Sequence, residues 1–116
     1  MGANDTISGG SNLGKRLGKI THSETVYLHH GKRKTQVTDR ISIGRSRDCD
    51  IVIEDNLASR YHALVQKIKN AYFICDMEST NGVRVNGETI EPGSYVRLHS
   101  TDRITIGRTE FHFKIG

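Results

Sequence analysis

RITIGRTEFHFKI, residues 103–115, alternates hydrophobic and polar side chains on both sides of a Gly-Arg pair. On the C-terminal side, Phe111, Phe113 and Ile115 occupy every second position. Successive side chains of a β-strand point to opposite faces of the sheet, so this period of two predicts strands with one buried and one solvated face.

The same alternation extends back along the chain to Glu24. Val26 and Leu28 alternate in ETVYLHHG, and Ile41 and Ile43 alternate in RISIGR. Further strands are expected in KTQVTD, DIVIE, HALVQKI, AYFICDM, VRVN and YVRLH. The one candidate helix, residues 55–69, falls into β-branched alternation after its first residues. No window of ten or more residues carries a convincing hydrophobic stripe of period 3.6. About ten short strands separated by regular turn signals predict an all-β, antiparallel sandwich.

Length and composition restrict the class of protein. The 116 residues make one domain with a modest core, and the 34% of hydrophobic residues contain no long apolar run. A transmembrane helix and a secretory signal are therefore not expected. Cys49 and Cys75 are too few for a disulfide framework or, with scattered histidines, for a zinc site. We expect both to be reduced and partly buried, with no metal and no cofactor.

The net charge of +4 is spread unevenly. Residues 1–22 carry three basic side chains and one acidic one, whereas residues 23–116 carry 14 basic and 12 acidic ones. The first twenty residues are rich in Gly, Ser and Asn without periodicity, which predicts a flexible tail over residues 1–22 and a sandwich domain over residues 23–116. Because the domain is nearly balanced in charge, a general nucleic-acid surface is not expected.

The residues that alternation leaves unexplained lie at strand ends. They form the segments 44–47 (GRSR), 56–62 (NLASRYH) and 79–82 (STNG). Together they offer arginines, hydroxyls and an amide, but no paired carboxylates and no nucleophile with an orienting base. Arginine matches a phosphate or carboxylate, and an Asn side chain suits a peptide backbone. The chemistry indicates a dianion held beside an extended chain, and it does not indicate an enzyme.

Two Asn-Gly pairs stand five positions apart. Asn86-Gly87 lies between alternating Val83 and Val85 on one side and Ile90 on the other, and it predicts an ordinary hairpin turn. Asn81-Gly82 follows Ser79-Thr80, which is not typical strand sequence, so this segment is predicted to be both a turn and part of a binding loop.

Four blocks in register resemble one known family. They are Gly44-Arg45, Ser59-Arg60-Tyr61-His62, Ser79-Thr80-Asn81-Gly82 and Asn86-Gly87, with CDIVIED at residues 49–55 between the first two. Over residues 24–116 this pattern is similar to the forkhead-associated (FHA) domain, a reader of phosphorylated motifs. The resemblance implies an eleven-stranded sandwich that binds phosphothreonine, in preference to phosphoserine, across loops at one end.

The resemblance also implies roles for individual residues. Arg45 would make the charged contact to the phosphate, and Ser59 would donate its hydroxyl to the same group. Arg60 would add backbone or side-chain contacts, and Thr80 would approach the phosphate from its own loop. Asn81 would hydrogen-bond the main chain of the bound peptide.

Other positions are expected to support the site. Gly44, His62 and Gly82 would shape the loops, with His62 as a hydrogen-bonded anchor and not a base or metal ligand. Arg47 is a candidate for a basic rim. Selection of residues after the phosphothreonine would fall to Leu57, Arg47 and the segment 83–84, without a readable preference.

The function expected is therefore a non-catalytic module for phosphothreonine segments of partner proteins, with a Ser/Thr kinase implied and no membrane partner. The location expected is intracellular: cytoplasmic, or nuclear in a eukaryote. The alternatives are a phosphate-independent assembly sandwich and, through the basic tail, a nucleic-acid role. Thr6 or Thr21 of the tail, once phosphorylated, is a candidate for self-recognition.

Overall fold

The computed structural model describes residues 25–116. The predicted tail, residues 1–22, with Thr6 and Thr21, lies outside the described residues, and so does the predicted start of the domain at residue 23. Within the described range, no helix is long and apolar enough to span a membrane.

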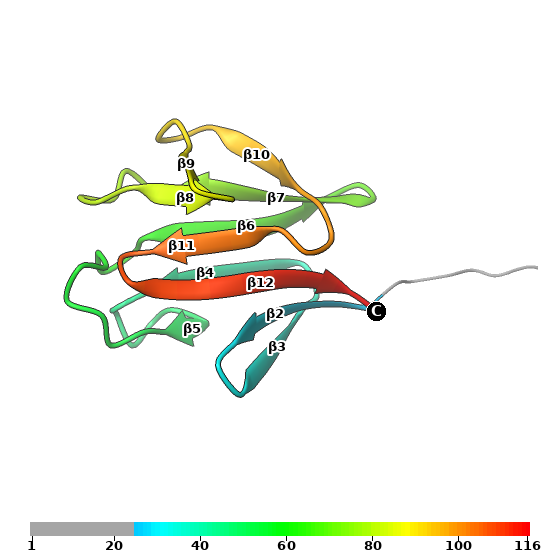
Figure 1. The fold of residues 1–116 in the computed structure, drawn as a ribbon, viewed down its shortest axis with the longest axis horizontal. Coiled ribbons are helices and arrows are strands. Elements are labelled where there is room, and N and C mark those ends of the chain that lie inside the picture. The colour runs from blue at the N-terminus through cyan, green and yellow to red at the C-terminus, as the bar shows by residue number, and fades with distance from the viewer. Residues whose placement is uncertain (1–24) are drawn as a thin grey trace, which may run out of the picture.

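The described residues form eleven strands and no helix, so the prediction of an all-β fold is confirmed (Figure 1). The strands are β2 (Val26–His30), β3 (Arg33–Val37), β4 (Arg40–Gly44), β5 (Ile51–Val52), β6 (Ala63–Ile68), β7 (Ala71–Asp76), β8 (Val83–Val85), β9 (Glu88–Thr89), β10 (Tyr95–Leu98), β11 (Arg103–Ile106) and β12 (Thr109–Ile115).

These strands make two sheets that pack face to face. The five-stranded sheet has the order β10-β7-β6-β4-β5, and the six-stranded sheet has the order β3-β2-β12-β11-β8-β9. The strand pairs are antiparallel, as predicted, except for β4 and β5, which run parallel with Ile43 opposite Ile51. This pair differs because residues 45–50 loop back along β4, where the Asp50 carboxylate accepts hydrogen bonds from the backbone N–H and the hydroxyl of Ser42.

The core lies between the sheets and follows the alternation of the sequence. Ile104, Ile106, Phe111 and Phe113 are buried, as the period of two in residues 103–115 predicts. Ile115 differs from this pattern, because it ends β12 at the open end of the sandwich and keeps 39% of its surface exposed. Close to it, the N–H of Gly116 donates to the carbonyl of Thr25 at 2.8 Å, so the two ends of the described chain meet there.

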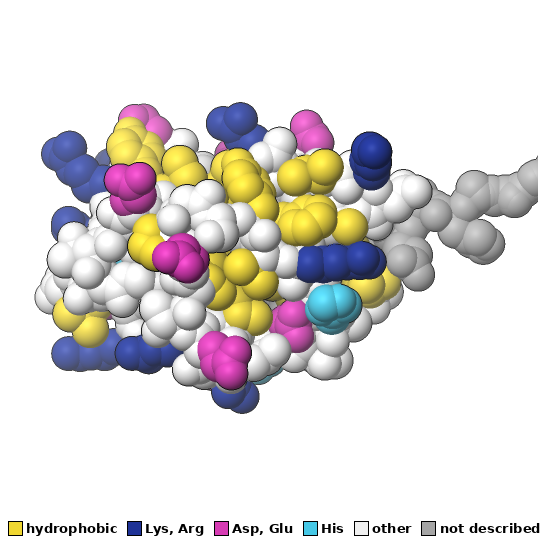
Figure 2. Space-filling model, turned by 90° about the horizontal axis from the view of Figure 1, so that it is seen from above, with side chains coloured by type: hydrophobic (Ala, Val, Ile, Leu, Met, Phe, Trp, Pro, Cys, Tyr) yellow, Lys and Arg dark blue, Asp and Glu magenta, His cyan; other side chains and the backbone are white. Residues whose placement is uncertain are grey.

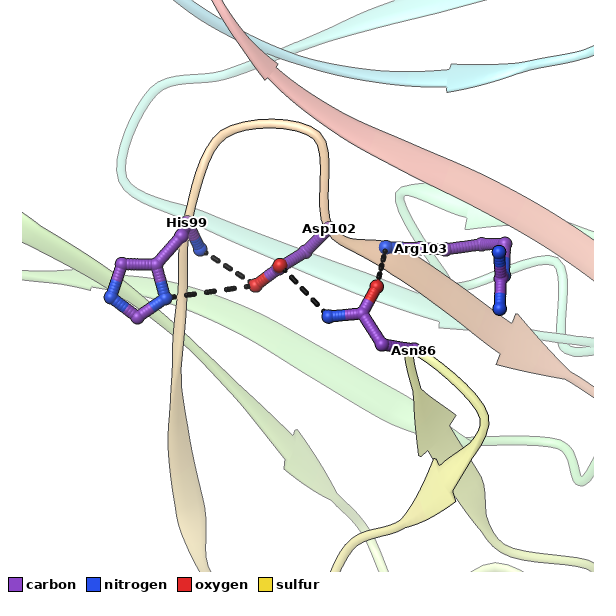
Figure 3. Close-up of polar contacts among 4 residues, drawn as sticks. All are labelled: Asn86, His99, Asp102 and Arg103. Atoms are coloured by element: carbon purple, nitrogen blue, oxygen red, sulfur yellow. Dashed lines mark hydrogen bonds and ion pairs between the residues drawn. The ribbon is translucent and has the colours of Figure 1, made fainter.

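The turn between β8 and β9 is the predicted Asn-Gly hairpin. Asn86 and Gly87 have φ values of 53° and 86°, and Val85 pairs with Glu88 across the two-residue turn. The Asn86 side chain donates to Asp102 and accepts from the N–H of Arg103, both at 2.9 Å (Figure 3). The hairpin is thereby attached to the turn between β10 and β11.

Hydrophobic side chains also reach the surface beside the edge strands β9 and β10. Figure 2, which looks down on this side of the sandwich, shows them gathered in one area. A hollow of about 550 Å³ has Val85, Ile90 and Val96 among its lining residues.

The two cysteines are free, as predicted, and both are buried, more fully than the partial burial expected. Cys49 lies in the loop between β4 and β5, and Cys75 lies on β7. Burial raises the pKa of both thiols, which makes them packing residues with little thiolate character.

Candidate functional site

Loops that are distant in the sequence meet at one end of the sandwich. The segments after β4, before β6 and between β7 and β8 all lie on the left of Figure 1, together with the turn between β11 and β12. Antiparallel pairing of β4 with β6 and of β6 with β7 requires this arrangement, because the end of one strand lies beside the start of the next. All three segments selected from the sequence therefore belong to one loop cluster.

Gly44 ends β4 where another loop crosses it closely. A Cβ atom at this position would lie 2.1 Å from the carbonyl oxygen of Arg60, which no side chain could tolerate without displacing that backbone. The next two residues bind the same loop: the N–H of Arg45 donates to Ser59 at 3.0 Å, and that of Ser46 donates to Arg60 at 3.1 Å. Position 44 therefore requires glycine, because only a residue without a Cβ atom leaves room for the Arg60 carbonyl.

The Arg45 side chain is exposed but anchored. Its Nε donates to the carbonyl of Ala58 at 2.6 Å, which fixes the guanidinium against the loop before β6. This contact uses one of the five N–H donors of the guanidinium. The other four belong to the two terminal nitrogens, which are the pair that binds a phosphate or carboxylate in bidentate fashion.

His62 connects two of the loops from inside the protein. Its side chain is fully buried, with Nδ1 accepting from the N–H of Ser59 at 2.9 Å and Nε2 lying 2.8 Å from the carbonyl of Gly82. Because Nδ1 accepts a hydrogen bond, the proton of the neutral ring resides on Nε2, which donates to Gly82. Both ring nitrogens are used by the fold, which leaves none for a metal or a proton-transfer role.

Ser59 and Thr80 contact each other across the same two loops. The Ser59 hydroxyl oxygen accepts the backbone N–H of Thr80 at 3.0 Å. A serine hydroxyl that accepts in this way keeps its own proton for a further acceptor. The bond also brings the exposed Thr80 side chain to the Ser59 side of the loop cluster.

Asn81 is tied to the loop before β6 by one of its two amide protons. Its Nδ2 donates to the carbonyl of Leu57 at 2.8 Å, while its side chain remains exposed. The bend itself is made by neighbours: the N–H of Ser79 donates to Asp76, and the Ser79 hydroxyl accepts from the N–H of Gly82, both at 2.9 Å. Only Gly82 of the STNG segment has a positive φ, at 82°.

Asp55 is an anchor that sequence reasoning missed. Its carboxylate accepts from the N–H of Leu57 at 2.9 Å, from the N–H of Arg108 at 2.7 Å and from the hydroxyl of Thr109 at 2.8 Å. The N–H bonds of Leu57 and Arg108 and the Thr109 hydroxyl hold the pKa of Asp55 below its usual range. An Asp two residues before Leu57 is a local sequence signal for such a turn. The contacts of Asp55 with Arg108 and Thr109, which lie 53 and 54 residues away, have no signal in the local sequence.

Arg47 and Arg60 lie on the loop cluster with exposed side chains. The backbone of Arg60 is part of the structure described above, because its carbonyl accepts from Ser46 and also from the Cys49 thiol at 3.3 Å. Among the described residues, no hydrogen bond of the kind that holds Arg45 fixes either guanidinium against the cluster. Both side chains bring positive charge to these loops.

A small pocket opens beside Asn81. It has a volume of about 160 Å³ and is lined by Leu57, Asn81, Gly82, Arg84, Thr105 and Gly107. Arg84 brings a positive charge to a wall whose other side chains are apolar or neutral and polar. The pocket is large enough for part of a side chain and is continuous with the Asn81 end of the loop cluster.

The cluster as a whole is suited to bind an anion. Arg45, Ser59, Thr80 and Asn81 are held together by contacts that all pass through residues 57–62. Their free groups are guanidinium and hydroxyl donors at one side and a carboxamide at the other. These groups can bind a phosphate or carboxylate next to a peptide backbone.

Comparison with known proteins identifies relatives for most of the chain. The FHA domain family model matches residues 41–107, which is more than half of the chain. An ABC transporter ATP-binding/permease protein of Mycobacterium tuberculosis is 33% identical over 108 residues, covering 92% of this chain and 12% of the relative. The transcriptional regulatory protein EmbR of the same species is 42% identical over 73 residues, or 63% of this chain and 18% of EmbR. The chain thus spans a small part of these relatives.

Solved structures agree in fold. Mycobacterium tuberculosis EmbR in complex with a low-affinity phosphopeptide has a TM-score of 0.74 and 37% identity, over 79% of this chain and 24% of EmbR. A domain from a study of phosphothreonine-dependent FHA domain interactions has a TM-score of 0.73 and 25% identity, over 79% of this chain and 97% of that domain. With its eleven-stranded sandwich and the family match over residues 41–107, the chain belongs to the forkhead-associated domain family.

Proposed function

We propose that this chain is a non-catalytic module that binds phosphothreonine-containing segments of partner proteins. The observation that carries the proposal is the loop cluster, in which Arg45, Ser59, Thr80 and Asn81 are fixed at one exposed end of the sandwich by 2.6–3.0 Å hydrogen bonds. A site that is organised before its ligand arrives loses less conformational entropy on binding.

The phosphate would bind between Arg45 and the loop that carries Thr80. Phosphothreonine has a charge near −2 and three acceptor oxygens, which match the terminal nitrogens of Arg45 and the proton of the Ser59 hydroxyl. Each charge-assisted hydrogen bond contributes about 1.5–3 kcal/mol, from which the cost of ordering the peptide is subtracted. We therefore expect moderate, reversible affinity. Arg60 would add backbone or side-chain contacts to the phosphate, and Arg47 would add attraction at the rim.

The peptide main chain would pass Asn81, whose carboxamide keeps its oxygen and one N–H after bonding to Leu57. A side chain that follows the phosphothreonine would then reach the pocket between Leu57 and Arg84. A positively charged wall favours an acidic or polar side chain over a basic one.

The relatives support this reading at the level of the family. EmbR is described in complex with a phosphopeptide, and a second neighbour comes from a study of phosphothreonine-dependent interactions. For this chain, we further propose that a Ser/Thr kinase produces the ligand and that the domain acts inside the cell. Phosphorylated Thr6 or Thr21 is a weaker candidate ligand of the same site.

Replacement of Arg45 tests the proposal. Arg45→Ala should reduce the affinity for a phosphothreonine peptide about a hundredfold or more, since it removes the charged contacts at the phosphate. Titration calorimetry would measure the affinity, and circular dichroism would check the fold. Arg97→Ala on β10 removes the same charge outside the loop cluster and should leave the affinity within about twofold.

Two results would overturn the proposal. One is unchanged phosphopeptide affinity in a folded Arg45→Ala variant. The other is equal affinity for the phosphorylated and unphosphorylated peptides, which would instead support a phosphate-independent assembly role. A phosphoserine version of the same peptide would measure the preference for threonine.

A further inference from the structure

The outward face of the six-stranded sheet carries a row of basic side chains across four strands. The register places Lys34 opposite His29, His29 opposite His112, and His112 opposite Arg103. Strands β3, β2, β12 and β11 lie in this order in the sheet, and Figure 1 shows β2, β12 and β11 side by side. Lys114 and Tyr27 are paired two residues further along. We call these six residues the basic face.

Within the described part of the sheet, the charge of the basic face is neutralised only at Arg103. Outward positions of β2, β3, β11 and β12 include one acidic side chain in the described structure, Glu110, and it pairs with Arg103 at 3.0 Å. The Nζ of Lys34 lies 4.1 Å from the center of the Tyr27 ring, a cation–π contact that leaves its charge in place. Lys34 and Lys114 are both exposed.

The two sheets differ in how close their outward basic side chains lie. On the outward face of the five-stranded sheet the corresponding row runs Arg40, Gln66, Phe73, Arg97, so that two strands separate its arginines. On the six-stranded sheet, Lys34 and Lys114 lie on β3 and β12 with only β2 between them, so their positive charges lie closer together.

The ionisation of His29 is consistent with a positive potential at this face. Partial desolvation, followed by the charges of Lys114, Lys34 and His112, lowers the pKa of His29. Those three residues come from β3 and β12, the strands on either side of β2. An anion placed here would be attracted by the same charges.

We propose that the basic face is a second binding surface, for an acidic segment of a partner protein. Four strands about 4.8 Å apart span roughly 14 Å, which matches an extended segment of about four or five residues at about 3.3 Å each. Nucleic-acid surfaces commonly make about six to ten phosphate contacts, more than the three Lys and Arg side chains of the basic face supply. Side-chain carboxylates of Asp and Glu, alternating along such a segment, match Lys34 and Lys114 better.

The basic face is distinct from the loop cluster and needs none of its residues. Arg45, Ser59 and Asn81 lie on loops at the end of the sandwich, whereas Lys34 and Lys114 lie on strands of one sheet. An unphosphorylated acidic peptide should therefore bind to the basic face even when the phosphothreonine site is inactive, so the two proposals can fail separately.

The test uses fluorescein-labelled hexaglutamate and fluorescence anisotropy at low ionic strength. The double variant Lys34→Glu/Lys114→Glu should bind it about tenfold more weakly or worse, because the attraction becomes repulsion. The matched control Arg40→Glu/Arg97→Glu makes the same change in net charge on the other sheet and should stay within about twofold of the wild type. Added salt should weaken wild-type binding, since the face is exposed.

Phosphopeptide affinity and circular dichroism would check that each variant is folded. If the Glu double variant does not fold, Lys34→Gln/Lys114→Gln should still bind hexaglutamate about threefold more weakly. Equal losses in the two double variants would overturn the proposal, because net charge alone would then explain binding. So would undetectable hexaglutamate binding, or tighter binding of a single-stranded oligonucleotide of equal charge.

Discussion

The two Asn-Gly pairs lie five positions apart and have different roles. At Asn86-Gly87 both residues have a positive φ, and both polar atoms of the Asn86 side chain are used by neighbouring parts of the fold. At Asn81-Gly82 only the glycine has a positive φ, and the Asn81 side chain makes a single bond to Leu57 while remaining exposed. The same dipeptide thus closes a hairpin in one place and presents a carboxamide to solvent in the other.

The difference lies in what surrounds each pair. Asn86 joins two strands that pair directly, and its partners, Asp102 and Arg103, complete its hydrogen bonds. Asn81 follows β7 and precedes β8, which belong to different sheets, so its loop crosses from one layer to the other. A crossing loop is not constrained by a ladder and can be held by distant side chains, which leaves some of its polar groups free.

Of the changes that compare the two Asn-Gly pairs, a substitution of Asn86 is expected to have the largest effect, and this effect is on stability. Asn86→Ala removes two side-chain hydrogen bonds and puts alanine at a φ of 53°, so it should lower the free energy of unfolding by about 2 kcal/mol. Urea denaturation would measure the change. Asn86→Gly keeps the backbone conformation and should lose about half as much. A loss below about 0.5 kcal/mol in Asn86→Ala would show that this turn is not part of the stabilising framework.

A smaller effect, on binding instead of stability, is expected at Asn81. Asn81→Ala should weaken phosphothreonine-peptide binding about tenfold, because the peptide backbone loses its carboxamide partner. Its cost in folding free energy should stay within about 1 kcal/mol, since one exposed hydrogen bond is lost. Calorimetry with Asn86→Ala as the control would separate the two pairs. Equal phosphopeptide affinities of Asn81→Ala and Asn86→Ala would contradict a binding role that is specific to Asn81.

The smallest effect concerns the acid stability of the loop that holds Asn81. The pKa of Asp55 is lowered in the folded state, first by the N–H of Leu57, so its carboxylate stabilises the fold above the unfolded value of about 3.9. That contribution is lost as the pH falls through the lowered folded value. Asp55→Asn should therefore reduce the loss of stability between about pH 5 and about pH 2.5. Urea midpoints along this series would measure it, and an unchanged pH profile would contradict the role of Asp55.

The strands and most of the core could be predicted from the local sequence. Alternation in residues 103–115 was sufficient, because every second side chain of a strand points to the same face of the sheet. It did not predict the exposure of Ile115, which depends on where the opposing sheet ends. It also did not predict the parallel pairing of β4 and β5, which depends on how residues 45–50 loop back.

The three loop segments were selected because alternation left them unexplained, but the roles of their residues were predicted from family resemblance, since spacing alone could not show that the segments meet. Arg45 and Ala58 are 13 residues apart, and Ser59 and Thr80 are 21 residues apart. Both contacts form because the order of the strands in the sheets brings these loops to the same end of the sandwich. The requirement for Gly44 is likewise invisible locally, because its φ is ordinary and the obstacle is the Arg60 carbonyl. Asp55 was missed for the same reason.

The hydrogen bond between Gly116 and Thr25 places both ends of the described chain at the edge of the sandwich away from the loop cluster (Figure 1). A domain with adjacent ends can be inserted into a longer polypeptide without separating the flanking segments. In such an arrangement, both connections would leave from the edge opposite the loop cluster, so neither of them would cover the loops.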